Sequence, residues 1–157
     1  MRIRSLANIG AVAALAAGLV PQALAAQAAA TRWDGTFTWD ATAKGGTLAI
    51  MTTPDGWATV ALTPTGTKAA LAGEGDAAPA KGQPAGLKGQ AWTGEDGKLS
   101  IDLPAFKEPG CNCVLLGTLE GTVSGTTASG NIAVRNSSTG QWQFASWTAS
   151  TKGAKKK

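Results

Sequence analysis

Short stretches of alternating apolar and polar residues run along most of this chain. In the clearest of them, 98–103, three apolar residues alternate with three polar ones. A period of two is typical of a β-strand with one buried face, and no segment after the first thirty residues has the 3.6-residue period of a helix. Strands are predicted at 36–40, 47–52, 57–62, 98–103, 114–123, 126–135 and 141–149, with a weaker one at 67–71.

Residues that favour tight turns separate these stretches. Pro54-Asp55-Gly56 is one such turn, and Gly97, Gly125 and Gly140 end three more. Because consecutive strands joined by short turns are mostly antiparallel neighbours, the chain predicts an all-β, antiparallel, up-and-down meander of about eight strands. A closed or nearly closed barrel is expected, since closure removes exposed strand edges. A two-sheet β-sandwich is the alternative.

Apolar residues in consistent phase are predicted to line the barrel interior: Leu48, Ile50, Val60, Leu62, Ile101 and Ile132. On the last predicted strand Trp142 and Phe144 share one face and Trp147 lies on the other, and we expect Trp142 to be a core residue. Gly117 and Gly121 occupy alternate positions within 114–123. Such glycines indicate curvature or close packing.

The first thirty residues have a different layout. Met1-Arg2-Ile3-Arg4 is basic, 6–20 is apolar and uncharged, and two small-residue motifs end at Ala25 and Ala28. This is the pattern of a bacterial secretory signal peptide, cleaved after one of those two alanines. The apolar run of about fifteen residues is shorter than the roughly twenty that span a membrane. We therefore expect an exported protein, periplasmic or extracellular, with no membrane span in the mature chain.

Three segments are predicted on this basis: a signal peptide at 1–28, a single β-barrel-like domain at 29–151 and a basic disordered tail at 152–157. Within the domain, 72–89 is rich in Ala, Gly and Pro, so we expect a long loop that could cover one mouth of the barrel.

Between residues 31 and 151 there are eight Lys and Arg against ten Asp and Glu, a net charge of −2. Without a basic patch there, binding to nucleic acid is not expected.

The chain contains no His. A Ser-His-Asp or Cys-His mechanism and a His-based zinc site are therefore excluded. Asp102 and Glu120 lie opposite the main apolar residues of their strands, which predicts exposed carboxylates rather than the catalytic pair of a glycosidase. No phosphate-binding or nucleotide-binding motif is present. We expect a protein that is not an enzyme, with no catalytic residue, no metal and no cofactor.

The meander opens with Trp33-Asp34-Gly35, directly before the first predicted strand, and Gly140-Gln141-Trp142 stands at the start of its last predicted strand. With these motifs the region from Trp33 to Ala149 resembles the small calycin-type barrels, the lipocalin and avidin group. The resemblance implies a fold type and, more loosely, a small-ligand role. It transfers no ligand-binding residue to this chain.

Cys111-Asn112-Cys113 contains the only two cysteines and follows the turn-forming pair Pro109-Gly110. Three interpretations remain open. Export favours a Cys111–Cys113 disulfide, provided that the turn brings the two Cα atoms into bonding range. The pair would also suit a thiol-redox or copper-handling site with two soft sulfur ligands. Free or intermolecular thiols are the third interpretation.

Six tryptophans stand in a chain without tyrosine: Trp33, Trp39, Trp57, Trp92, Trp142 and Trp147. Core packing is the simplest role for such large side chains, and stacking on a flat ligand is the functional alternative. Trp39, Trp57 and Trp92 are the candidate ligand-binding residues because they lie near predicted turns. The leading hypothesis is a non-catalytic exported barrel that binds a small apolar or aromatic ligand. A structural or interaction module of the cell envelope and a thiol-redox or copper-handling protein are the alternatives.

Overall fold

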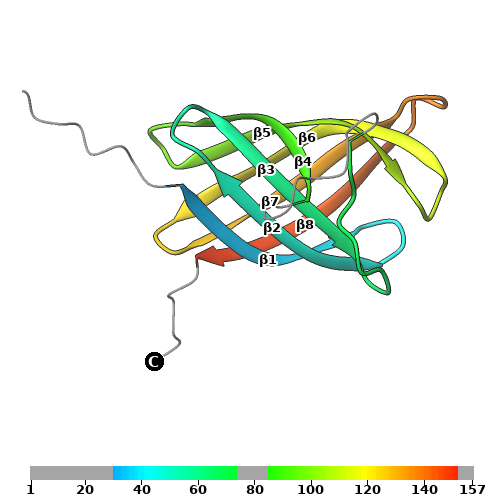
Figure 1. The fold of residues 1–157 in the computed structure, drawn as a ribbon, viewed down its shortest axis with the longest axis horizontal. Coiled ribbons are helices and arrows are strands. Elements are labelled where there is room, and N and C mark those ends of the chain that lie inside the picture. Colours follow the sequence, from blue (N-terminus) through cyan, green and yellow to red (C-terminus); the bar gives the residue numbers. More distant parts are fainter. Residues whose placement is uncertain (1–29, 74–84, 152–157) are drawn as a thin grey trace, which may run out of the picture.

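The structure is a computed structural model that describes residues 30–73 and 85–151. The predicted signal peptide, most of the predicted loop and the basic tail lie outside these residues. The eight strands are β1 (Thr31–Trp39), β2 (Gly45–Thr52), β3 (Trp57–Pro64), β4 (Leu87–Thr93), β5 (Lys98–Glu108), β6 (Cys113–Ser124), β7 (Thr127–Asn136) and β8 (Trp142–Thr151). Each pairs antiparallel with the next, and β8 pairs with β1, which closes the barrel (Figure 1).

The predicted closed up-and-down meander is confirmed, and seven of its strands lie where the alternation placed them. The strand predicted at 67–71 is wrong. After β3 ends at Pro64, Gly66 has a positive φ of 88° and turns the chain, and only Leu71 returns to donate a hydrogen bond to the carbonyl of Leu62. The segment therefore touches β3 again at Leu62 and does not pair along it.

β4 was not predicted, and the loop predicted at 72–89 is wrong for 87–89, which are the first residues of this strand. The inward-facing side of β4 has a single large residue, Leu87, followed by Gly89 and Ala91. A Cβ at Gly89 would meet the carbonyl oxygen of Asp102 on β5 at 1.7 Å, so small residues are required there. Alternation between small and polar residues carries too weak an apolar signal to predict a strand.

The interior of the barrel is filled by apolar side chains that form one continuous cluster. The six residues predicted to line it are all buried, and Trp147, Phe37 and Phe106 are the largest fully buried side chains. The prediction that Trp142 belongs to the core is wrong, because its side chain is 58% exposed. Alternation correctly placed Trp142 and Trp147 on opposite faces of β8. The pairing of Trp147 with Phe37 and Gly130 shows that the face with Trp147, and not the face with Trp142, points inward.

Gly121 makes room for the Trp147 indole. Gly121 on β6 pairs with Gly130 on β7, which pairs with Trp147 on β8. A Cβ at Gly121 would come within 2.4 Å of the Trp147 ring, and the indole Nε1–H donates a hydrogen bond to the carbonyl oxygen of Glu120 at 3.0 Å. The close packing predicted at Gly121 is thus confirmed, with Trp147 as the packed residue.

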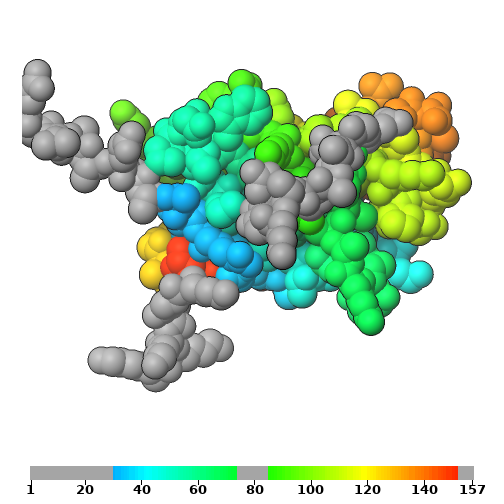
Figure 2. Space-filling model, in the orientation of Figure 1, coloured from blue at the N-terminus to red at the C-terminus, as the bar shows by residue number. Residues whose placement is uncertain are grey.

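The two ends of the barrel carry different turns. At the terminal end, β1 begins and β8 ends, and the turns 53–56, 94–97 and 125–126 join the strands. At the cysteine end, the turns 40–44, 109–112 and 137–141 lie together, on the right of Figure 1. Figure 2 shows the β5–β6 and β7–β8 turns side by side there, where the amide of Ser137 donates to the carbonyl of Val114. Among the described residues no helix has the length and apolar character needed to cross a membrane.

Candidate functional site

The three tryptophans proposed to bind a ligand do not come together. Trp39 ends β1 at the cysteine end, faces the interior, and packs edge-on against Phe37 with ring centroids 5.9 Å apart. Trp57 and Trp92 lie at the terminal end on the outer surfaces of β3 and β4, and their side chains are 48% and 50% exposed. Trp39 is therefore separate from the other two, whereas Trp57 and Trp92 stand on neighbouring strands.

The register of β3 and β4 places Trp57 and Trp92 diagonally across the strand pair. Trp57 pairs with Gln90, and Trp92 lies two residues further along the same face of β4. Diagonal neighbours of this kind lie about 7–8 Å apart at Cα, within reach of aromatic side chains. Both indoles therefore lie on the same outer face of the β3–β4 strand pair, which we call the Trp57–Trp92 surface.

Backbone hydrogen bonds hold the turn that precedes Trp57. The amide of Thr53 donates to the carbonyl of Trp57 at 2.8 Å, and the hydroxyl of Thr53 donates to the carboxylate of Asp55. The amide of Ala91 donates to the carbonyl of Gly56 at 2.8 Å, which joins this turn to β4. Because both strands are tied at the turn, the backbone positions of Trp57 and Trp92 are fixed relative to each other before any ligand binds.

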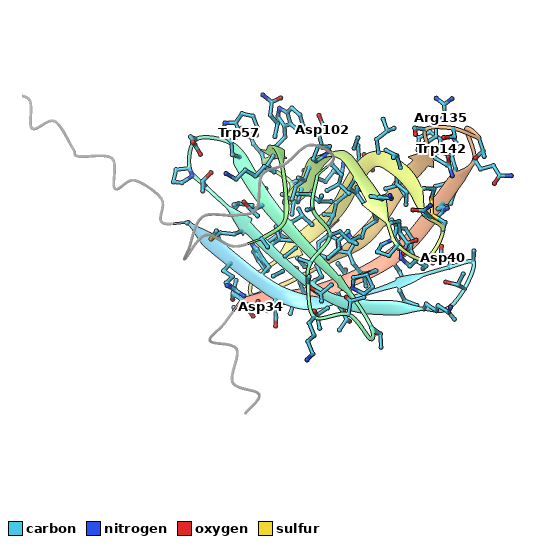
Figure 3. All side chains as sticks on the ribbon, turned by 45° about the vertical axis from the view of Figure 1, so that its right-hand side comes forward. Asp34, Asp40, Trp57, Asp102, Arg135 and Trp142 are labelled. Atoms are coloured by element: carbon cyan, nitrogen blue, oxygen red, sulfur yellow. A yellow bond between two sulfur atoms is a disulfide. The ribbon has the colours of Figure 1, made fainter. Side chains whose placement is uncertain are left out.

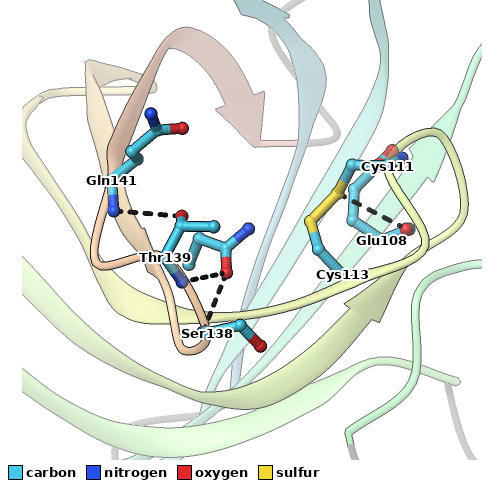
Figure 4. Close-up of a disulfide and its surroundings, with 7 residues drawn as sticks. Glu108, Cys111, Cys113, Ser138, Thr139 and Gln141 are labelled. Carbon is cyan, nitrogen blue, oxygen red and sulfur yellow. Dashed lines mark hydrogen bonds between the residues drawn. A yellow bond between two sulfur atoms is a disulfide. The ribbon is translucent and has the colours of Figure 1, made fainter.

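Cys111 and Cys113 lie at the exposed β5–β6 turn, and Figure 4 draws their sulfurs joined as a disulfide. The Cα atoms are 5.1 Å apart, within the range that disulfides span. Asn112 between them has a positive φ of 49°, a conformation that asparagine tolerates better than most residues. The amide of Cys111 donates to the carboxylate of Glu108 at 2.8 Å. The turn therefore brings the two Cα atoms closer together than an extended strand would. The oxidation state of the two cysteines stays a prediction.

We expect neither cysteine of the native protein, purified without reductant, to react with iodoacetamide. The intact mass should be two hydrogens below that of the reduced chain, and the reduced, denatured control should take up two labels. Because the bond closes a very short loop, Cys111→Ser should lower the free energy of unfolding by less than about 2 kcal/mol. Two labels on the native protein would contradict the disulfide and favour free thiols.

Two exposed carboxylates, Asp102 and Glu120, are diagonal neighbours across β5 and β6 on the outer surface of the barrel. Asp102 and Glu120 are both exposed, as predicted, and Asp102 pairs with Thr118 whereas Glu120 pairs with Ser100. Among residues 30–73 and 85–151, no three His, Cys, Asp or Glu side chains are grouped closely enough to hold a metal ion. A hydrogen bond from Lys98 lowers the pKa of Asp96, and the same pair raises the pKa of Lys98. Both groups are fully exposed, so this is a surface ion pair of small energetic weight.

Two open depressions on the outer surface are lined mainly by Thr, Ser and Gly. The one at the terminal end contains Asp34, whose Oδ1 accepts a hydrogen bond from Arg32 at 3.0 Å and whose Oδ2 is buried without a partner. The hydrogen bond and charge of Asp34 raise the pKa of Arg32. These depressions offer hydroxyl groups but little aromatic surface, so they suit a flat apolar ligand less well than Trp57 and Trp92 do.

A second exposed apolar area, which was not predicted, lies on β6 and β8. Leu116 on β6 and Trp142 and Phe144 on β8 are 44%, 58% and 51% exposed. Leu116 directly follows the buried Leu115, so its side chain must point to the opposite, outer face of β6. That adjacency was the sequence signal for an exposed leucine. For Trp142 and Phe144 the sequence carried no signal, because alternation alone does not say which face of a strand points inward.

Comparisons with protein-family models, with curated proteins and with solved structures gave no match for this chain. The resemblance to the calycin barrels holds at the level of architecture: eight antiparallel strands in an up-and-down order that close on themselves. Of the two motifs that suggested it, Trp33 is buried on β1 and Trp142 is exposed on β8.

Proposed function

We propose that this chain is an exported, non-catalytic binding protein that holds a small, flat, apolar or aromatic ligand on the outer surface of its barrel. The Trp57–Trp92 surface carries the proposal, because two indoles left half exposed on adjacent strands offer aromatic faces to a ligand. Export rests on the signal-peptide pattern of residues 1–28. Kinship with the calycin barrels belongs to the same proposal and rests on the strand order.

The filled interior supports an outer site over an internal one. Leu48, Ile50 and Val60, which were predicted to line the barrel interior, are no more than 2% exposed and pack into the common core. Eight strands make a barrel just wide enough for side chains to fill, although some barrels of this size hold one small ligand. Here Trp147, Phe37 and Phe106 occupy the space that an internal ligand would need.

A fluorescent aromatic probe tests this function. We expect 1-anilinonaphthalene-8-sulfonate to bind the native protein and Trp57→Ala or Trp92→Ala to weaken its binding at least about fivefold, since each loses one stacking face of roughly 1 kcal/mol. Trp142→Ala is the matched control, because it removes an equally exposed indole at the other end of the barrel. Circular dichroism would verify that all three variants fold.

Equal binding by Trp57→Ala, Trp92→Ala and the native chain would contradict the Trp57–Trp92 surface as the ligand site. Loss of probe binding in Trp142→Ala alone would move the site to β8. The alternative of an interaction module is favoured by a different observation, the exposed apolar residues on β6 and β8.

A further inference from the structure

The outer surface at the cysteine end carries a compact apolar patch on three adjacent strands. Leu116 on β6 pairs with Arg135 on β7, and Arg135 pairs with Trp142 on β8. One row further along, Ala133 pairs with Phe144. We call these five residues the β6–β8 patch. Large apolar side chains gathered on the surface of a small domain mark an interaction site.

The two aromatic residues of the β6–β8 patch are already ordered by each other. Trp142 and Phe144 point outward from the same face of β8, with ring centroids 6.3 Å apart and planes inclined by 15°. A pair of parallel rings held on a strand loses little conformational entropy when a partner covers it. The patch is therefore arranged to pack against another apolar surface.

Opposite charges flank this aromatic pair. Arg135 stands beside Trp142 on the β7 side, while Asp40 stands on the β1 side, where its amide donates to the carbonyl of Phe144 at 2.9 Å. Figure 3 shows Arg135 next to Trp142 and Asp40 further along the same end of the barrel. Within the described ranges the ion pairs are Arg32–Asp34 and Lys98–Asp96, so neither flanking charge is neutralised by a neighbour.

We propose that the β6–β8 patch binds the same patch of a second copy of this chain, forming a symmetric dimer. A two-fold axis in the interface, passing between Trp142 and Phe144, places Arg135 of each copy opposite Asp40 of the other. In such an isologous contact every pairing occurs twice, so one cation and one anion on opposite flanks complement themselves. A surface with two like charges on its flanks would repel its own copy instead.

The closed barrel limits how two copies can meet. Since β1 pairs with β8, no strand edge is open to extend the sheet into a neighbour, and contact must be made face to face through side chains. Homodimer interfaces are more apolar than other protein contacts, and a standard one covers about 800 Å² per partner. Trp142 and Phe144 supply the apolar centre of such a contact, and Arg135 and Asp40 supply the charges on its two sides.

Sedimentation velocity of the full mature chain, over micromolar to millimolar concentration, tests the dimer. We expect a monomer–dimer equilibrium, and we expect Trp142→Asp to weaken the association more than about tenfold by placing a charge at its centre. Trp57→Asp is the matched control, because it places the same charge on an equally exposed indole outside the patch and should leave the equilibrium unchanged. Circular dichroism would establish that both variants are folded.

A charge exchange separates self-association from binding to another partner. Arg135→Asp and Asp40→Arg should each weaken the dimer, because like charges then face each other across the interface. The double variant should restore the association of the native chain. A monomer at every concentration, or a dimer that these substitutions leave unchanged, would overturn the proposal. Trp57 and Trp92 lie at the other end of the barrel, so the proposed ligand site does not depend on the dimer. Failure of the dimer proposal would leave the ligand proposal standing.

Discussion

Replacing Trp147 by alanine is expected to lower the free energy of unfolding by about 3–5 kcal/mol, the largest effect of any single substitution considered for this protein. Trp147 is only 2% exposed, and no larger side chain is buried in the barrel. Its removal leaves a cavity over Gly121 and leaves the carbonyl of Glu120 without the indole donor. The closed sheet cannot collapse into that space, because every strand is hydrogen-bonded on both sides.

Trp142 on the same strand is the matched control. It makes one parallel contact with Phe144 and is otherwise exposed, so Trp142→Ala should cost about 1 kcal/mol or less. Urea unfolding of both variants, followed by circular dichroism at low protein concentration, measures the two free energies without a contribution from association. Equal costs for the two tryptophans would mean that β8 presents both faces to comparable surroundings, contrary to its pairing with β1 and β7.

The second large effect is expected at Gly121, where alanine should destabilise the barrel by about 2–3 kcal/mol. The added Cβ would stand 2.4 Å from the Trp147 ring and 2.6 Å from the carbonyl oxygen of Ser129. Neither neighbour can withdraw: the indole is held by its bond to Glu120, and the carbonyl belongs to the backbone of β7. Strain from overpacking, rather than lost burial, is the physical cause.

Gly110→Ala provides the control for Gly121→Ala. Gly110 lies in the exposed β5–β6 turn, and a Cβ there would meet only the flexible carboxylate end of Glu108, at 3.0 Å. We expect the free energy of unfolding of Gly110→Ala, measured in urea, to stay within about 0.5 kcal/mol of that of the native protein. The steric account of Gly121 would be refuted by a Gly121→Ala variant as stable as Gly110→Ala. In that case the Trp147 ring must be free to move.

Several features of the candidate sites followed from local sequence. The turn at 53–56 and the strand that begins at Trp57 were both predictable, because Pro, Asp and Gly favour a turn and the alternation resumes directly after it. The exposure of Asp102 and Glu120 followed from their phase in the same way. By contrast, the proximity of Trp92 to Trp57 depended on β4, which small inward residues concealed.

Alternation along the chain determined the all-β class, the positions of seven of the eight strands and their antiparallel order, because a period of two and short turns are local properties. Only the tertiary structure decided which face of β8 is buried and where β4 pairs, since both depend on the register with neighbouring strands. Register also brought Leu116, Arg135 and Trp142 into one row and set Asp40 beside Phe144. Asp40 and Phe144, far apart in sequence, become neighbours only because β8 closes on β1, and no local pattern records that contact.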